Sequence, residues 1–324
     1  MSSHCEFFKN QDWHKIVKNN FKSDTRVFFD AIVPVSGGEK AKIPLVKEEI
    51  EILQSKKIVF GRYGSVYLSD YLDFSGSHLT TKESIGNLVF QSQQMGVEVL
   101  WLSNIPKESI LHQALTEYSI DKTNCYFLEC IPTLGVVCAD NYEDYLSSLS
   151  KNSRRNIKRK LETLSKFGVK HRIVQASKDG VSLLLKNQAS RASLTSLAPL
   201  TADQSLLNTI FEASKMKDVY ISELISNKDT ISQLLLLVKN KTIGILIQCF
   251  DPKFAQYSPS FCNFAHLIKY AYDNDFTYVD FLRGDEEYKK HFINHEIRME
   301  KFITILNSTI EEKSLISFIE RFEE

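Results

Sequence analysis

The 324-residue sequence has few of the residues that build stapled or fibrous proteins. Its six cysteines form no CxxC pair and have no histidine at zinc-ligand spacing, which argues against a disulfide framework and a zinc site. Glycine (12 residues) and proline (7 residues) are too scarce for a collagen-like or low-complexity chain. We therefore predict reduced cysteines in the core of a globular protein.

Long apolar runs are also absent. The longest, Leu234–Val238 and Ile243–Ile247, are far shorter than a membrane span, and the first residues lack the apolar segment of a signal peptide. Forty basic and 40 acidic residues give a formal net charge of zero, so general attraction to nucleic acid or anionic lipid is not expected. These features favour a cytoplasmic location without a membrane span.

The length suggests two domains at roughly 150 residues each, although one large mixed domain is the alternative. No Pro/Gly/Ser-rich linker marks a boundary, so the division depends on the pattern of predicted elements. We place an N-terminal half at 1–135, a C-terminal domain at 136–307 and a closing helix at 308–324.

In the N-terminal half, strand-like and helix-like segments alternate. The predicted strands are Thr25–Val35, Lys57–Val66, Val97–Leu102 and Asn124–Ile131, and the predicted helices are Thr81–Met95 and Pro106–Leu115. Gly96 is expected in the left-handed position that ends a helix. Pro132 is expected to end the last strand, because proline has no N–H for a strand ladder.

The C-terminal half has sharper signals. Capping boxes are predicted at Asp140/Glu143 and Ser308/Glu311, and Asn152 or Ser153 is expected to cap a second helix. Three antiparallel strands are predicted at Val219–Ile225, Thr230–Val238 and Thr242–Phe250. The remaining elements are helices at Ser177–Ser196, Thr201–Lys215, Ser260–Asn274 and within Glu286–Phe292, and strands at Tyr278–Leu282 and Arg298–Leu306. This order predicts a mixed α/β fold around an antiparallel sheet.

Two segments have the most specific patterns, SRRNI at 153–157 and RGDEEYK at 283–289. Together with the intervening stretch, they resemble the acetyltransferase domain of the CelD-like branch of the GNAT N-acyltransferase superfamily. The resemblance extends from about Trp13 to Leu306 and is strongest after Cys125. It implies an α/β (α+β) GNAT core with a mixed, mainly antiparallel sheet flanked by helices, and two GNAT-like halves in tandem, as in Fem-type aminoacyltransferases.

The resemblance also implies transfer of an acyl group from acyl-CoA, such as acetyl-CoA, to an amine. Such transfer needs a deprotonated amine, donors for the oxyanion and a proton source for the leaving thiolate, but no covalent nucleophile. Our candidate catalytic residues are Arg283, Asp285, Tyr288 and His266. Tyr288 could protonate the thiolate, and His266 could act as a base near neutral pH. A core tyrosine and a packed histidine are the alternatives.

The candidate residues for CoA binding fall into three groups. Ser258 and Ser260 precede a helix, whose N-terminus suits a phosphate. Lys289 follows the RGD turn. Arg154, Arg155 and Lys158 lie on a basic helix, whose ridge could hold CoA phosphates, a polyanionic acceptor or RNA, or be merely solvated. The family usually has glycine where Ser260 stands, and the glycine-rich loop of typical CoA-binding members is missing.

Other polar groups leave alternatives open. Asp280 lies within a predicted strand, either as a carboxylate of raised pKa or as an ion-pair partner of Arg283. Asp70 and Tyr71 match a family segment that could line an acceptor cleft, although a turn is the plainer interpretation. His291 and His295 are four residues apart without a third ligand, so no metal is expected.

We therefore expect a cytoplasmic N-acyltransferase that works by direct attack in a ternary complex. Its expected acceptor is a small-molecule amine on a sugar or another metabolite. One alternative is a Fem-like transferase that uses aminoacyl-tRNA, and RNA is otherwise not expected as a partner. The other is a non-catalytic GNAT-like binding or scaffold protein.

Overall fold

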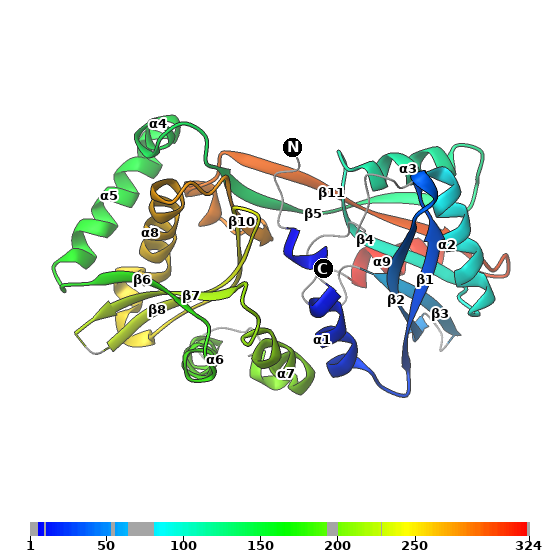
Figure 1. The fold of residues 1–324 in the computed structure, drawn as a ribbon, viewed down its shortest axis with the longest axis horizontal. Helices are drawn as coiled ribbons and strands as arrows, with labels where there is room; N and C mark the ends of the chain where they lie inside the picture. Colours follow the sequence, from blue (N-terminus) through cyan, green and yellow to red (C-terminus); the bar gives the residue numbers. More distant parts are fainter. Residues whose placement is uncertain are drawn as a thin grey trace. The chain divides into compact units, whose positions relative to one another are not determined.

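The computed structural model describes residues 6–9, 11–52, 56–63, 81–192, 200–227 and 229–322. The chain forms two compact units (Figure 1). Unit 1 comprises Met1–Phe7 and Pro132–Glu296, and unit 2 comprises Phe8–Ile131 and Ile297–Glu324. The chain thus passes between the units at 7/8, 131/132 and 296/297, whereas the sequence analysis divided it at 135/136 and 307/308.

Unit 2 contains a sheet with the strand order β1-β2-β3-β4-β11-β5. Its strands are β1 (Arg26–Pro34), β2 (Lys40–Ile52), β3 (Lys56–Tyr63), β4 (Val99–Pro106), and parts of β5 (Cys125–Val137) and β11 (His295–Ile305). Its helices are α1 (Gln11–Phe21), α2 (Lys82–Gln94), α3 (Ile110–Ser119) and α9 (Glu312–Phe322). Strands β1, β2 and β3 form an antiparallel meander, and β4 returns parallel to β3.

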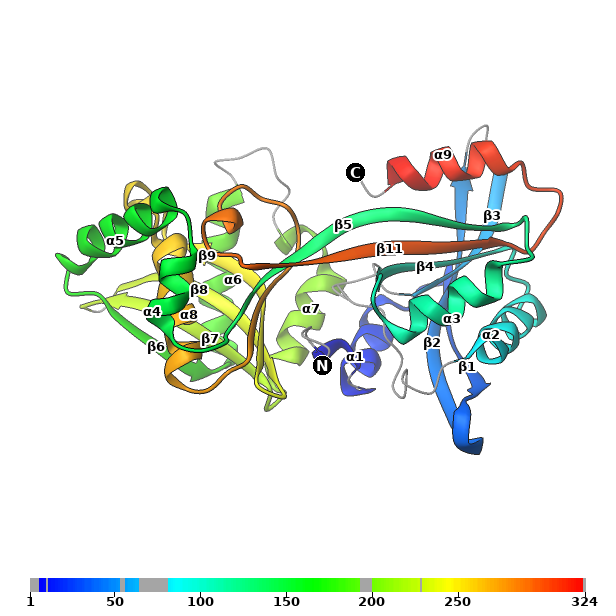
Figure 2. The same ribbon diagram turned by 90° about the horizontal axis from the view of Figure 1, so that it is seen from above.

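Alternating side chains give the unit 2 sheet two apolar faces. Leu100 and Leu102 of β4 belong to a core cluster that includes residues of α2 and α3. Val99 and Trp101 belong to a second cluster that includes residues of α9. Figure 2 shows α9 on one face of this sheet, with α2 and α3 on the other.

Unit 1 contains the strand order β5-β10-β9-β8-β7-β6. Its strands, besides β5, are β6 (Lys170–Gln175), β7 (Val219–Ser226), β8 (Asp229–Lys239), β9 (Thr242–Phe250) and β10 (Tyr278–Arg283). Its α-helices are α4 (Tyr142–Ser148), α5 (Lys151–Ser165), α6 (Lys178–Ala192), α7 (Gln204–Ala213) and α8 (Pro259–Asp273). Neighbouring strands are antiparallel, except that β9 and β10 are parallel.

Helix α8 packs against the unit 1 sheet through its apolar side chains. Phe264 and Leu267 of α8 share a buried cluster with Leu234 of β8 and Ile243 of β9. Ile157 of α5 belongs to the same cluster, so α5 also packs against α8. This packing places the N-terminus of α8 beside the basic helix α5.

The predicted fold class is confirmed, because a mainly antiparallel mixed sheet is flanked by helices. The predicted meander of the C-terminal half is confirmed as β7, β8 and β9. The predicted helix at 81–95 is confirmed as α2, with the Thr81 side chain as its N-cap and Gly96 at φ +73°. None of the described helices is long and apolar enough to cross a membrane.

Pro132 does not end a strand, because β5 runs on to Val137. The Pro132 carbonyl accepts a hydrogen bond from the Gly284 N–H (3.3 Å), so the ladder uses the acceptor that proline retains. Strand β2 was missed, although buried Ala41, Ile43 and Leu45 alternate with exposed Lys40 and Lys42 and half-buried Pro44.

Three predicted helix starts were wrong by a few residues. Asn141, not Asp140, caps α4, and Ser150, not Asn152 or Ser153, caps α5 by accepting from the Ser153 N–H. Helix α9 begins at Glu312, not after Ser308. Each stretch contains several residues that are able to cap, so the sequence favours the region of the start rather than the residue.

Candidate functional site

Strands β9 and β10 separate soon after they meet. They pair in parallel only from Tyr278/Thr242 to Asp280/Gly244, although β9 continues to Phe250. Beyond this point, the pairing of β10 with β5 shifts register, and Leu282 adopts φ +57°. The Asp280 carboxylate, which is fully buried, accepts from the Leu282 N–H (2.8 Å) and supports this bend. The carboxyl ends of two parallel strands thus diverge next to the helix that connects them.

The N-terminus of that helix, α8, is not closed by a side-chain cap. Ser258 is the N-cap residue in the left-handed conformation (φ 51°, ψ 56°), and its side chain makes no capping hydrogen bond. Pro259 has no N–H, so the first donors of the helix are those of Ser260 and Phe261, which have no acceptor within the helix. These donors and the helix dipole favour an anion at this end of α8.

Lys160 of α5 brings a positive charge to this end of α8. Its ammonium donates to Ser258 Oγ (2.6 Å) and lies 4.8 Å from the centroid of the Phe261 ring. Burial lowers the pKa of Lys160 from its ordinary value. The sequence analysis did not select Lys160. Its spacing of three from Ile157 and four from Leu164, both buried, was the available signal.

The serine of the SRRNI segment contacts a residue that follows the RGDEEYK segment. Ser153 Oγ lies 3.3 Å from Nδ1 of His291, two residues beyond Lys289. Arg154 instead closes the end of α4, because its Nη1 donates to the carbonyls of Ser147 and Leu149 (both 2.6 Å). The first motif therefore contacts the turn that ends the second, and Arg154 has a structural position.

The other predicted cations on α5 are exposed. Lys158 forms a loose ion pair with Glu162 (3.9 Å), and Arg155 has no hydrogen bond or ion pair with any described residue. These two side chains form a solvent-facing basic ridge, whereas Lys160 points to the start of α8.

Lys289 holds the turn that follows β10. Only 3% of it is exposed, and its ammonium donates to the carbonyls of Arg283 (3.0 Å) and Gly284 (3.2 Å) and pairs with Glu286 (2.8 Å). These contacts use all three donors of a lysine. Gly284 adopts φ +126°, and a Cβ there would collide with Glu286 and Lys289. Lys289 therefore positions Arg283 and the exposed Asp285.

Tyr288 is fixed beside the diverging strands, and His266 is not. The Tyr288 hydroxyl accepts from Gln248 Nε2 (2.9 Å) of β9, and its ring stacks on Phe264 of α8 (5.3 Å between centroids). His266 stacks on His171 of β6 instead (5.4 Å between centroids). Burial lowers the pKa of His266, and burial lowers that of His171 to about 4. The structure thus separates two residues that the sequence analysis grouped as catalytic.

Asp70 and Tyr71 lie outside the described residues. In the described ranges, no group of three His, Cys, Asp or Glu residues lies close enough to hold a metal ion.

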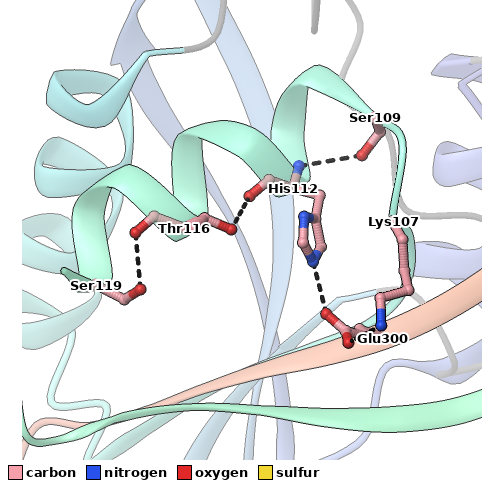
Figure 3. Close-up of polar contacts among 6 residues, drawn as sticks. All are labelled: Lys107, Ser109, His112, Thr116, Ser119 and Glu300. Atoms are coloured by element: carbon pink, nitrogen blue, oxygen red, sulfur yellow. Dashed lines mark hydrogen bonds and ion pairs between the residues drawn. The ribbon is translucent and has the colours of Figure 1, made fainter.

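Unit 2 contains a polar cluster that the sequence analysis did not predict (Figure 3). Glu300 of β11 contacts His112 Nε2 of α3 and Lys107 Nζ, which follows β4, at 2.6 Å each. Burial raises the pKa of Glu300, but the hydrogen bonds from Lys107 and His112 outweigh it and bring this pKa below its ordinary value. The cluster ties α3 to the sheet of unit 2.

Comparison with known proteins agrees with this geometry. Residues 151–290, from the start of α5 to the turn after β10, match the family model of the acetyltransferase (GNAT) domain. No curated protein sequence matches the chain.

Several solved structures share the fold over nearly the whole chain. FemX is 12% identical, with 98% of this chain and 99% of that chain covered and a TM-score of 0.61. L-PGS from Bacillus licheniformis is 11% identical, with 97% and 96% covered and a TM-score of 0.57. A protein of unknown function from Bacteroides thetaiotaomicron is 11% identical, with 94% and 92% covered and a TM-score of 0.56.

The diverging parallel strands, the helix between them and the matched domain define an acyltransferase fold. Residues 151–290 thus form an acyltransferase domain of the GNAT type.

Proposed function

We propose that the protein transfers an acyl group from acyl-CoA, such as acetyl-CoA, to the amine of a sugar or another small metabolite. The observation that carries this proposal is the open N-terminus of α8 with the Lys160 ammonium beside it. The pyrophosphate of CoA is an anion of the kind that a helix N-terminus and a lysine bind together. This pair of groups replaces the glycine-rich loop that the sequence lacks.

The donor would extend from α8 between the diverging ends of β9 and β10, and it supplies an activated thioester. The N–H groups of Ser260 and Phe261, Lys160 and Ser258 would hold its phosphates. Arg155 and Lys158 are exposed and able to contact a further phosphate. Lys289 would support the site through the turn at Arg283 rather than by touching the donor.

Tyr288 is the proposed proton source for the leaving thiolate. Its oxygen accepts from Gln248, so the hydroxyl proton is directed to a partner other than Gln248. Asp285 is exposed at the strand end, where its carboxylate could accept a proton from the attacking amine or bind it. His266 has no part in this mechanism, because it packs on His171.

Arg283 and Asp285 are the proposed contacts for the acceptor. Both follow β10, at the end of the strand where it has separated from β9. A guanidinium and a carboxylate together suit a small acceptor that presents an amine next to hydroxyl or carboxylate groups. A sugar amine fits this description.

A second candidate is a transferase that uses aminoacyl-tRNA. Two observations favour it: the exposed basic ridge of Arg155 and Lys158, and the similarity of fold to FemX along the whole chain. RNA binding by such a ridge would weaken steeply with salt. A non-catalytic scaffold is the third candidate.

The three candidates are separated by calorimetric titration of the full chain with acetyl-CoA, longer acyl-CoAs and a tRNA mixture. We expect saturable micromolar binding of at least one acyl-CoA, and weaker acceptor turnover in Arg283→Ala with donor affinity retained. No acyl-CoA binding at millimolar concentration would overturn the proposal. Salt-sensitive tRNA binding would then favour the second candidate, and binding of neither ligand would favour the scaffold.

A further inference from the structure

A buried network of polar groups crosses the core of unit 1 beneath α8. It begins at edge strand β6, where His171 Nε2 lies 2.9 Å from Ser222 Oγ of β7. Ser222 Oγ donates to Asn263 Oδ1 of α8 (2.7 Å), so it accepts from His171. The first half of the network thus joins β6 and β7 to the middle of α8.

The second half leads from Asn263 to the candidate site. Asn263 Nδ2 donates to Ser232 Oγ of β8 (3.3 Å), and Ser232 Oγ donates to the Cys249 carbonyl of β9 (2.9 Å). Ser260 Oγ, in the first turn of α8, donates weakly to the same carbonyl (3.4 Å). Strands β6, β7, β8 and β9 each contribute one partner in their order across the sheet.

This arrangement is more than helix packing requires. Ser222, Ser232 and Asn263 are fully buried, and buried polar groups are unfavourable unless their hydrogen bonds are made. Leucine and alanine would fill the same space without needing hydrogen-bond partners. A polar group retained in a core often fixes one arrangement among several that apolar packing would allow.

Asn263 fixes α8 more tightly than an apolar side chain would. Its Oδ1 accepts from Ser222 Oγ, while its Nδ2 donates both to Ser232 Oγ and to the Ser222 carbonyl (3.2 Å). A helix that slips by one residue moves by about 1.5 Å and turns by about 100°, which would break all three bonds. The network therefore permits a single register of α8 on β7 and β8.

We infer that Asn263 is a positioning residue, which sets the register of α8 and thereby the place of the Ser260 and Phe261 N–H groups relative to Lys160. The inference rests on the proposed function, because it explains the register of α8 by the binding of the acyl donor. Ser260 lies three residues before Asn263, on the same side of α8. Phe264, next to Asn263, stacks on Tyr288, so the same register also sets the position of the tyrosine.

The test compares two variants of the full chain. Asn263→Leu alone leaves Ser222 and Ser232 with unmatched groups, so we expect a lower Tm and weaker binding of acetyl-CoA. The triple variant Ser222→Ala/Ser232→Ala/Asn263→Leu removes the three fully buried polar side chains together, and we expect most of the Tm to return. Its Kd for acetyl-CoA should stay at least tenfold above that of the wild type. A triple variant that regains both stability and affinity would overturn the inference.

Thr209→Val is the matched control. Thr209 of α7 is fully buried and donates to the Ser205 carbonyl (2.8 Å), away from α8. The Thr209→Val variant should have a slightly lower Tm and an unchanged Kd for acetyl-CoA. An equal loss of affinity in this control would attribute the effect to general loosening of unit 1 and contradict the role of Asn263.

A second readout does not depend on the donor. Hydrogen exchange of the Cys262 amide, which donates to the Ser258 carbonyl (3.2 Å) in the free protein, should be at least tenfold faster in the triple variant, with residues 266–272 unchanged. Unchanged exchange at Cys262 would overturn the inference even if the protein binds no acyl-CoA. Absence of wild-type binding with faster exchange would instead reject the proposed function and keep the positioning role.

Discussion

The two units repeat one local architecture and use it differently. In unit 2, the meander β1-β2-β3 leads through α2 to β4, which is parallel to β3. In unit 1, the meander β7-β8-β9 leads through α8 to β10, which is parallel to β9. Each returning strand has one residue in the left-handed region, Asn104 (φ 59°) and Leu282 (φ 57°). This repetition supports the proposal of two GNAT-like halves.

The difference lies at the start of the connecting helix. In α2, the Thr81 hydroxyl accepts from the Ser84 N–H (3.3 Å) and the Ser84 hydroxyl accepts from the Thr81 N–H (3.2 Å). In α8, the Ser258 side chain makes no capping hydrogen bond, and its hydroxyl oxygen accepts from the Lys160 ammonium. One helix end is closed by a capping box, and the other has no side-chain cap. We therefore propose a single donor site, in unit 1.

The largest expected effect is on the free energy of unfolding. It contrasts Lys289, which follows β10, with Lys107, which follows β4. Lys289→Met should lower the free energy of unfolding by about 3 kcal/mol, because it leaves two carbonyls and a carboxylate without their buried partner. Lys107→Met should cost less than about 1 kcal/mol, because 36% of that side chain is exposed. Urea denaturation measures both values, and equal losses would contradict the comparison.

Charge reversal at Lys160 tests the open helix end. Lys160→Glu should weaken acetyl-CoA binding by about 30-fold to 100-fold, equivalent to about 2–3 kcal/mol for a charge-assisted contact. Arg159→Glu makes the same change of charge at the neighbouring exposed position and should cost less than about threefold. Isothermal titration of the two variants measures the ratio. A similar loss in both would indicate a general effect of charge and no specific contact.

The two cap positions should differ in stability. Thr81→Ala should lower the free energy of unfolding by about 1 kcal/mol, the usual value of an N-cap. Ser258→Ala should cost less than about 0.5 kcal/mol, because its side chain makes no cap bond. Denaturant unfolding checks the order, and a larger loss at Ser258 would show that α8 is capped like α2.

The smallest effect at neutral pH is expected at His171. Its folded pKa of about 4 lies below the ordinary 6.5, so the unfolded chain binds more protons between these values. Stability from this group is complete above pH 6.5 and is lost as the pH falls toward 4. His171→Gln, which keeps a donor for Ser222, should therefore reduce the fall in Tm between pH 7 and pH 5. An identical fall in the wild type and the variant would contradict this assignment.

Local patterns predicted much of the fold. The meander β7-β8-β9 and the Thr81 cap follow from alternation and cap chemistry within short segments. Strand β5 was cut at Pro132, because the sequence does not show that only the Pro132 carbonyl takes part in the ladder. The error arose where long-range pairing overrode a local rule.

The candidate site, too, was predicted from the sequence only where local patterns determine it. The sequence located the start of α8 and the RGD turn, since both follow from helix and strand ends. It did not predict that Lys160 reaches Ser258, or that Arg154 closes α4, because these contacts depend on how α5 packs. His266 was grouped with Tyr288 by chemistry, and the rotation of α8 separates them.

Hydrogen exchange with and without saturating acetyl-CoA tests the central claim most directly, because it reports on both helix ends in one experiment. The account predicts slower exchange of the Ser260 and Phe261 amides and no change at residues 82–84. Slower exchange at the start of α2, or no change at the start of α8 while calorimetry shows binding, would contradict it.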